Sequence, residues 1–339
     1  MSEKLLEVKG LQTKFSTRFG EVKAVRGIDF EVERGDSIGI VGESGSGKTV
    51  TALSIMRLIE KPGIIEGGQI LYRGEDLLKK SEREMENTRG KKISMVFQDP
   101  ATSLNPAYTI GNQVIETIIR NTALSRLGAA MLAEELLRAA GLSESKKSMK
   151  QYPHELSTGM RQRVAIAMAL SGEPDLLIAD EPTSALDVTL QAKILKLFEK
   201  IKKEKELSMI IITHDLGVAA EACNKILIMY GGLIMESGDA KDVLTNPMHP
   251  YTKGLLGSVP GMRSDSGARL SAIEGSPPDP TKPVPGCPFS ERCPHAMKIC
   301  GLMIPKFYKT ENGGRSMCHL LHENAPRHSV EELLGGGRL

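Results

Sequence analysis

Residues 37–56 read SIGIVGESGSGKTVTALSIM, and this stretch determines the fold class that we expect. It starts with an apolar, β-favouring run at residues 38–41, turns through closely spaced glycines and continues as a helix-compatible segment. The turn contains G-x-x-x-x-G-K-T at residues 42–49, the pattern of a loop that holds phosphate groups between a strand and a helix. A merely flexible glycine turn is the alternative, and the flanking strand and helix argue against it.

The residue types of this P-loop (residues 42–49) fit the chemistry of a bound nucleotide. Glycines let backbone N–H groups approach a phosphate chain closely, and the positive end of the following helix points at it. Lys48 supplies a charge for the terminal phosphates, and the Thr49 hydroxyl can coordinate Mg²⁺. The residues that we expect to contact the nucleotide are Gly42, Ser44, Gly45, Ser46, Gly47, Lys48, Thr49 and Val50.

A second motif, DLLIADEPTSALD at residues 175–187, places two adjacent acids after an apolar strand. In a doubly wound parallel sheet these acids emerge where the strand ends, beside a P-loop. Asp180 would then hold Mg²⁺ through its water shell, and Glu181 would polarise an attacking water molecule. The alternative is that the two acids only cap the end of a strand.

Composition limits the remaining function classes. The chain has 339 residues, 40% of them hydrophobic, which is enough for one large domain with a smaller one, or for two modest domains. Lys and Arg (44) nearly balance Asp and Glu (42), and aromatic residues are scarce at 4%, so a nucleic-acid partner is not expected. The sequence has neither a long apolar run nor a secretory signal, so we expect a cytoplasmic protein.

Further segments follow the P-loop in a characteristic order. Gln98 stands in VFQDPATSLNP, LSTGMRQRVAIAMAL begins at Leu156, and His214 follows the apolar run of IIITHD. Alone, Gln98 or His214 would be an ordinary polar loop residue. As an ordered set with the two motifs above, they resemble the ATP-binding cassette of ABC transporters, over about residues 4–260.

This resemblance implies an α/β fold of the P-loop NTPase type. The cassette, residues 1–260, would contain a RecA-like core sheet and a helical subdomain at about residues 99–157. Two segments read directly as helices of that subdomain, GNQVIETIIR and AAMLAEELLRAAGL. TLQAKILKLFEKIKKEKEL reads as a helix packed on the sheet, because its apolar residues share one face (Leu190, Ile194, Leu197, Phe198 and Ile201). Its lysine-rich end reads as a solvated face.

The resemblance also assigns roles to single residues. It implies ATP as the nucleotide, and no N-K-x-D or T-K-x-D motif for reading guanine follows the P-loop. The catalytic residues would be Glu181, His214 and Gln98, and the Mg²⁺ site would comprise Thr49, Gln98 and Asp180. Phe19 stands where the family places an aromatic that stacks on adenine, and an aromatic on the surface of a strand is the alternative.

The signature segment around Ser157 would act on a second cassette. Ser157 can cap the following helix, whose N terminus, with Gly159, would face the γ-phosphate held by the partner's P-loop. One P-loop and one signature cannot complete such a site in a monomer. The family usually has two glycines after the serine, whereas this chain has Thr158 and then Gly159. That departure could weaken the γ-phosphate contact, and it hints at a non-identical partner cassette.

Two further segments indicate the transporter branch. QDPATSLNP (residues 98–106) and HPYTKGLLGSVP (residues 249–260) resemble the dipeptide and oligopeptide importers, whose relatives also carry nickel and glutathione. The resemblance implies two transmembrane permease subunits, indirect cooperation with an extracytoplasmic peptide-binding protein and a location at the cytoplasmic face of the cell membrane. The rival hypothesis is a soluble ABC-type ATPase that remodels nucleic acid or ribosomes. Such chains usually carry tandem cassettes or a long coiled-coil insertion, and neither is evident here.

Residues 261–339 form the expected C-terminal extension, a small irregular domain in which the proline-rich GSPPDPTKPVPGCP, residues 275–288, reads as an extended linker. Four of the five cysteines lie in it: Cys287, Cys293, Cys300 and Cys318. Disulfides, free thiols and a metal centre are the alternatives, and a cytosolic location disfavours disulfides. We expect a metal centre, because four clustered thiols suit either zinc or a four-iron, four-sulfur cluster. The resemblance to dipeptide-importer ATPases favours the 4Fe-4S cluster over Zn²⁺. The lone Cys223 reads as a buried apolar residue.

Overall fold

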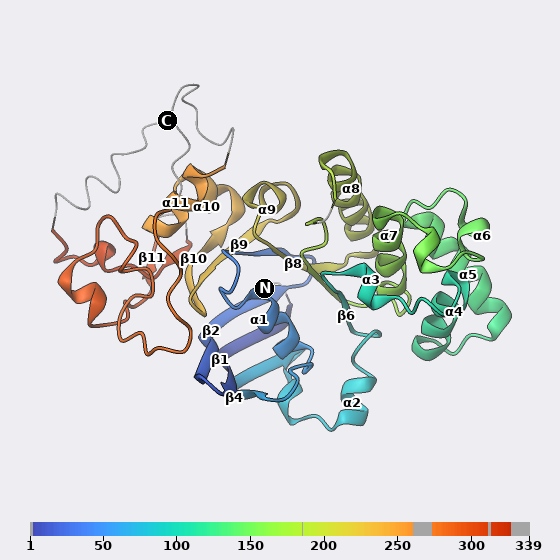
Figure 1. Ribbon diagram of the computed structural model, residues 1–339, viewed down its shortest axis with the longest axis horizontal. Helices are drawn as coiled ribbons and strands as arrows, with labels where there is room; N and C mark the ends of the chain where they lie inside the picture. Colours follow the sequence, from blue (N-terminus) through green and yellow to red (C-terminus); the bar gives the residue numbers. More distant parts are fainter. Residues whose placement is uncertain (1–2, 185, 260–272, 311–312, 327–339) are drawn as a thin grey trace. The chain divides into compact units, whose positions relative to one another are not determined.

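The computed structural model describes residues 3–184, 186–259, 273–310 and 313–326 (Figure 1). These residues divide into two compact units. The first comprises the N-terminal residues up to Leu5, Val32–Ser37 and Asp76–Thr213, and the second comprises Leu6–Glu31, Ile38–Glu75 and the described residues from His214 onward. The second unit includes residues from both sides of position 260, so the expected boundary there between cassette and extension stays a prediction.

The first unit has a parallel sheet. Its strands are β6 (Ile93–Val96), β7 (Leu176–Asp180) and β8 (Ser208–Thr213), with β7 paired to both others. Every residue of these strands is buried. Their continuous apolar runs are typical of parallel strands covered on both faces. The apolar strand that was expected ahead of the two acids is therefore confirmed as β7, and Asp180 is its last residue.

Helices make up much of the rest of the first unit (Figure 1). They are α2 (Glu82–Glu86), α3 (Pro100–Ser103), α4 (Ile110–Asn121), α5 (Arg126–Ala139), α6 (Ser145–Ser148), α7 (Thr158–Ala169) and α8 (Val188–Lys205). The helices α4, α5 and α7 contact one another, and this group contains both predicted helices of the helical subdomain. In α8 the predicted apolar face is buried except for Leu190, which is half-buried, and Leu195 joins it.

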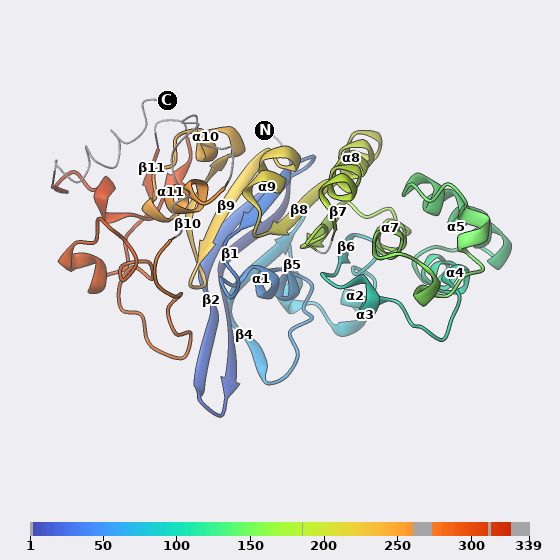
Figure 2. The same cartoon turned by 45° about the horizontal axis from the view of Figure 1, so that its top comes forward.

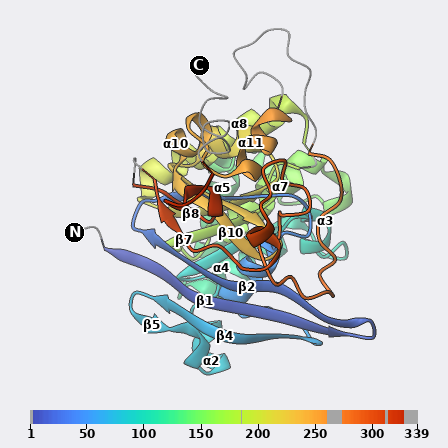
Figure 3. The ribbon, with the colours of Figure 1, turned by 90° about the vertical axis from the view of Figure 1, so that its left-hand side faces the viewer.

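The second unit contains an antiparallel sheet that the sequence did not lead us to expect. Its order is β2 (Gly20–Glu33), β1 (Lys4–Thr17), β4 (Gly63–Tyr72) and β5 (Glu75–Asp76). Figure 3 shows β1, β2 and β4 as long neighbouring strands. The strands β1 and β4 pair from Leu6 opposite Tyr72 to Phe15 opposite Gly63, with irregular register near Gln12.

A second sheet of this unit positions the P-loop. Strand β3 (Ser37–Val41) pairs in parallel with β9 (Lys225–Tyr230), and β9 pairs antiparallel with β10 (Leu233–Asp239). The short strands β12 (Arg315–Ser316) and β11 (Tyr308–Lys309) continue the sheet beyond β10. The helices of this unit are α1 (Lys48–Ile55), α9 (Leu216–Ala222), α10 (Ala240–Thr245) and α11 (Pro250–Gly257). Figure 2 shows α10 beside β10, with which it packs.

The described part of the C-terminal extension is mostly irregular, as expected from its prolines. It is nevertheless packed, because Cys287, Phe289 and Cys300 belong to the same hydrophobic cluster as Tyr230 and Tyr251. Across the described ranges, no helix has the length and apolar character that a membrane crossing needs.

Candidate functional site

The P-loop connects β3 to α1, and two of its glycines, Gly42 and Gly47, could not be replaced by a larger residue without displacing the backbone. A Cβ atom on Gly42 would lie 2.1 Å from the Met229 carbonyl oxygen. Gly47 has a φ of 103°, and a Cβ atom there would lie 2.4 Å from the Ala24 carbonyl oxygen. The close approach to β9 and β2 therefore forces a tight loop, which is the shape a phosphate cradle needs.

The helix α1 begins directly after the P-loop glycines. Its N-cap residue is Gly47, which makes no side-chain cap hydrogen bond. The Lys48 ammonium lies over the loop and donates to the Gly42 and Glu43 carbonyl oxygens, both at 2.8 Å. Of the other residues expected here, Ser44, Gly45 and Thr49 are exposed, Val50 is half-buried and Ser46 is buried. Backbone amides, an ammonium and an exposed hydroxyl together fit a nucleotide phosphate with Mg²⁺.

The two acids after β7 lie in different environments. Asp180 is buried with 2% exposure, whereas Glu181 is half-buried and has a φ of 44°, in the left-handed region. The Glu181 N–H donates to the Ile212 carbonyl oxygen at 2.9 Å, which fixes this turn against β8. Gln98, which follows β6, donates from Nε2 to the Glu181 carboxylate at 3.1 Å. The structure thus brings together two residues that are 83 positions apart in the sequence.

Ser157 begins α7 as predicted. Its hydroxyl accepts a hydrogen bond from the Met160 N–H at 3.3 Å, the arrangement of a helix N-cap. Gly159 is buried, and a Cβ atom there would lie 2.1 Å from a Leu190 methyl carbon on α8. The Thr158 side chain is exposed, and its hydroxyl accepts a hydrogen bond from the Arg161 guanidinium at 3.2 Å. The N terminus of α7 therefore presents a hydroxyl, a β-branched residue and a glycine next to one another.

Phe19 and His214 belong to the second unit, together with the P-loop. Phe19 lies in the turn between β1 and β2 with 76% of its surface exposed, and the Arg18 guanidinium lies 4.8 Å from its ring centroid. His214 is exposed between β8 and α9. Gln98, Asp180, Glu181, Ser157 and Gly159 belong to the first unit.

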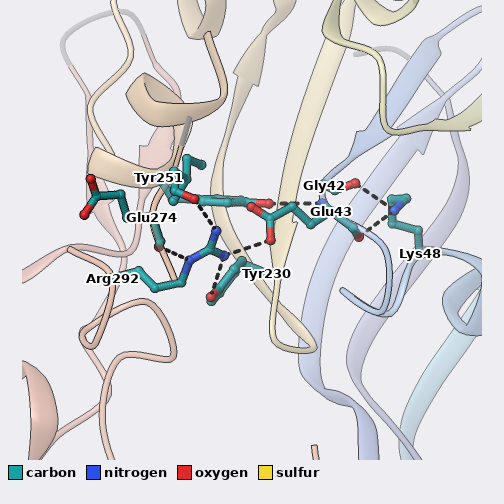
Figure 4. A network of polar contacts seen from close by, with 8 residues as sticks. Gly42, Glu43, Lys48, Tyr230, Tyr251, Glu274 and Arg292 are labelled. Carbon is teal, nitrogen blue, oxygen red and sulfur yellow. Dashed lines mark hydrogen bonds and ion pairs between the residues drawn. The ribbon is translucent and has the colours of Figure 1, made fainter. Parts of the chain in front are cut away.

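The sequence analysis missed the roles of three residues in and beside the P-loop, Glu43, Tyr251 and Arg292 (Figure 4). The Glu43 carboxylate accepts a hydrogen bond from Arg292 at 2.8 Å, and the Glu43 N–H donates to the Tyr251 hydroxyl at 3.0 Å. Tyr251 lies in the HPY segment that we used to identify the transporter branch. Glu43 stands at a variable position of the P-loop pattern, and Arg292 lies among the cysteines, so neither residue carried a local signal.

His249, the N-cap residue of α11, is held as a neutral side chain. His249 caps α11 by accepting the Tyr251 N–H on Nδ1 at 3.0 Å. Complete burial lowers the pKa of His249 to about 3. The Glu236 carboxylate accepts the His249 N–H at 3.0 Å, and burial raises the pKa of this carboxyl group. These contacts fix the start of α11, and with it the ring that contacts the P-loop.

The structure corrects the prediction of a metal centre in the C-terminal extension. Cys287, Cys293, Cys300 and Cys318 line one small pocket, together with His249, Pro250, Phe289, Ser290, His295, Pro305, His319 and Leu320. Among the described residues, no group of three or more His, Cys, Asp or Glu side chains is arranged to hold a metal ion. The expected 4Fe-4S cluster, and metal binding by these thiols in general, is therefore wrong.

The physical reason is the apolar surroundings of the thiols. Burial raises the pKa of Cys287 to about 12, of Cys293 to about 11 and of Cys318 to about 12. In these apolar surroundings the protonated thiol is the favoured form, and the side chains pack as small hydrophobic groups. Cys287 and Cys300 instead pack in a hydrophobic core, and none of the five cysteines, all of which the structure describes, forms a disulfide. Cys223 is buried, as predicted, and lies against Gly39.

Comparisons with known proteins agree with the geometry of the site. Residues 25–184 match the family described as ABC transporter, and residues 235–300 match the family described as oligopeptide/dipeptide transporter, C-terminal region. A dimeric post-hydrolysis structure of the ATP-binding cassette MJ0796, bound to ADP and Pi, is similar in fold. It has a TM-score of 0.63 and 27% identity, and the match covers 69% of this chain and 98% of that one.

Relatives of similar length are more alike in sequence. The oligopeptide transport ATP-binding protein OppD of Bacillus subtilis is 48% identical, over 96% of this chain and 91% of that protein. The dipeptide transport ATP-binding protein DppD of the same organism is also 48% identical, over 89% of this chain and 90% of that protein. Both names state ATP binding and transport, and neither mentions a metal centre. The chain is an ATPase of the ABC transporter family, with the C-terminal region of the oligopeptide and dipeptide transporters.

Proposed function

We propose that this chain hydrolyses ATP to power the import of dipeptides or oligopeptides through a membrane transporter. The observation that carries the proposal is the glycine-forced loop between β3 and α1, with Lys48 and an uncapped helix N terminus beside it. The names of the relatives supply the substrate class, since they describe peptide transport and not the remodelling of nucleic acid or ribosomes. Nucleic acid is not among the proposed partners.

The proposed nucleotide contacts are those expected from the sequence. The P-loop amides and Lys48 would hold the phosphates, while Phe19 would stack on the adenine. Thr49, Gln98 and Asp180 would hold Mg²⁺, which neutralises phosphate charge when bound. Thr49 is exposed at the start of α1, and buried Asp180 ends β7, so both lie at element ends where such ligands are placed.

Hydrolysis would proceed by attack of a water molecule on the γ-phosphorus, with release of ADP and phosphate. We propose that the Glu181 carboxylate accepts a hydrogen bond from this water and orients it. The hydrogen bond from Gln98 and the backbone contact to Ile212 hold Glu181 in place. Gln98 can thereby report occupancy of the site, because a change at Glu181 alters its hydrogen bond. His214 would contact the γ-phosphate as a switch.

Replacing Glu181 by Gln tests this assignment. The amide keeps the shape of the side chain and a hydrogen-bonding oxygen but is a far weaker base, so we expect ATP turnover in the assembled transporter to fall by at least 100-fold. ATP binding should persist. Glu173→Gln is the matched control, because Glu173 also has a positive φ, of 51°, and its carboxylate pairs with Lys205 on the surface. Unchanged turnover in Glu181→Gln would exclude Glu181 as the general base.

We further propose that ATP lies between two cassettes, with Ser157 and Gly159 of each facing the P-loop of the other. The similar cassette reported above is dimeric and bound to ADP and Pi, which supports the pairing of two cassettes. A non-identical paralogue would be the second cassette, and two permease subunits would bind the pair at the cytoplasmic face of the cell membrane. A peptide-binding protein outside the membrane would deliver the substrate. Loss of peptide uptake in a strain that lacks this chain, with recovery by wild type but not by Glu181→Gln, is the expected result.

A further inference from the structure

A salt bridge joins the C-terminal extension to the P-loop (Figure 4). Arg292 and Glu43 are 249 positions apart in the sequence, and Nη1 of Arg292 lies 2.8 Å from the Glu43 carboxylate. The Arg292 side chain is 7% exposed and that of Glu43 is 25% exposed, so water screens the pair only in part. Both residues belong to the second unit.

The Arg292 guanidinium is held in place independently of Glu43. Its Nε donates to the Glu274 carbonyl oxygen at 2.9 Å, and its Nη2 donates to the Ile273 carbonyl oxygen at 3.1 Å. Nη1 also donates to the Tyr230 hydroxyl at 3.1 Å, and the group lies 5.7 Å and 6.0 Å from the ring centroids of Tyr230 and Phe289. A planar donor held on this many sides presents its charge to Glu43 in one fixed direction.

Glu43 is in turn contacted at three of its groups. Arg292 binds the carboxylate, the Tyr251 hydroxyl accepts the amide hydrogen, and Lys48 donates to the carbonyl oxygen at 2.8 Å. The ring centroids of Tyr230, which contacts Arg292, and Tyr251, which contacts the Glu43 amide, lie 4.6 Å apart. The network therefore runs from the extension to the ammonium that we assign to the phosphates.

We propose that Arg292 is a positioning residue for ATP binding, which acts through Glu43. It fixes the position of the P-loop and neutralises a carboxylate that would otherwise stand unpaired next to the triphosphate. This inference rests on the proposed role of residues 42–49 in phosphate binding. It gives the C-terminal extension a part in nucleotide affinity that needs no metal.

Electrostatics makes the inference specific. Without Arg292, the Glu43 carboxylate repels phosphate oxygens, and this repulsion grows with the charge of the ligand. ATP carries more negative charge than ADP, so loss of Arg292 should weaken ATP binding more than ADP binding. Salt screens charges that lie near the surface, so part of the lost affinity should return at high ionic strength. A purely structural role of Arg292 predicts neither a larger effect on ATP than on ADP nor a recovery of affinity at high salt.

The experiment measures dissociation constants for ATP and ADP by calorimetry at low and high salt, on the full chain. We expect Arg292→Gln to weaken ATP binding about tenfold, which corresponds to about 1.4 kcal/mol. In a Glu43→Gln background, the same substitution should change the dissociation constant less than twofold, because the charge to be neutralised is gone. Arg292→Lys keeps the charge and should stay within about threefold of wild type.

Two controls separate the possible failures. Arg315→Gln removes another extension arginine, which donates to Ser237 at 3.2 Å and stacks on Phe307 without touching the P-loop, so ATP affinity should not change. Lys48→Ala should abolish ATP binding, and if it does not, the proposed P-loop role fails first. Normal ATP affinity in Arg292→Gln, an equal loss in the Glu43→Gln background, or an equal loss in Arg292→Lys would each overturn the inference.

Discussion

Three backbone positions of the site, Gly45, Gly47 and Glu181, adopt conformations that residues with a side chain avoid. Gly47 has a φ of 103°, and the position that a Cβ atom would take faces the Ala24 carbonyl oxygen. Glu181 has a φ of 44° although it is not a glycine, which costs of the order of 1 kcal/mol. The hydrogen bond of the Glu181 N–H to Ile212 helps to hold that turn. Such strain is typical of residues whose side chains must point at a substrate.

Replacing Gly47 by Ala should damage both folding and nucleotide binding. The new methyl group meets the Ala24 carbonyl oxygen and adds left-handed strain, so we expect about 3 kcal/mol of lost stability. Gly45→Ala is the matched control, because Gly45 has a φ of 77° but nothing within 4 Å of a built Cβ atom, and strain alone costs about 1 kcal/mol. Thermal unfolding and ATP titration of both variants check this. Equal destabilisation would show that the close approach at Gly47 does not matter.

At the residue scale, the sequence predicted what is local. The P-loop could be identified because its glycines, Lys48 and Thr49 stand at fixed spacing between a strand and a helix. The contact of Arg292 with Glu43 could not, because it depends on how the extension packs on β9 and α11. The cysteines misled for a related reason. A cluster of thiols can reflect a shared apolar core as well as a metal, and spacing alone does not separate the two.

At the scale of elements, the sequence predicted the strands that are buried on both faces. The strands β3, β7 and β8 could be predicted because they are continuous apolar runs buried on both faces. The sheet of β1, β2 and β4 could not, because its strands alternate between buried, half-buried and exposed residues over long stretches. The start of helix α11 depends instead on a single buried imidazole, that of His249, which caps the helix.

The cap of α11 makes stability depend on pH. In the folded chain the pKa of His249 is about 3, below the ordinary value of 6.5, so between these values the unfolded chain binds a proton that the folded chain does not bind. The contribution of His249 to stability is therefore complete above pH 6.5 and is lost as the pH falls from there toward 3. When the pH falls from 7 to 5, we expect His249 to lower the free energy of unfolding by about 2 kcal/mol.

Comparison of wild type with His249→Asn isolates that contribution. Asn can still cap α11 but does not titrate, and Glu236, whose raised pKa acts in the opposite direction, is present in both proteins. Denaturant unfolding should show that the free energy of unfolding falls less between pH 7 and pH 5 in the variant than in wild type. A loss of the same size in both proteins would mean that His249 is protonated in the folded chain.

At the scale of the whole molecule, the departure of the signature from its family has a direct consequence for assembly. If each α7 faces the P-loop of another cassette, Thr158 lies where backbone amides approach the γ-phosphate. Its side chain is exposed and accepts a hydrogen bond from Arg161, so its methyl group occupies space that a glycine would leave open. A pair of identical chains would carry this obstacle twice, whereas a paralogue with an ordinary signature would carry it once.

Thr158→Gly should therefore speed ATP hydrolysis by the isolated chain paired with itself. Removal of the side chain would allow one more hydrogen bond from a backbone amide to the γ-phosphate. A hydrogen bond of about 0.5–1.5 kcal/mol corresponds to roughly a two- to tenfold increase in turnover. Specific activity should also rise with protein concentration, because the active species contains two chains. Thr158→Ser, which removes only the methyl group, should fall between wild type and Thr158→Gly. If both variants hydrolyse ATP at the wild-type rate across the concentration series, Thr158 is no obstacle, and the preference for a non-identical partner loses its basis.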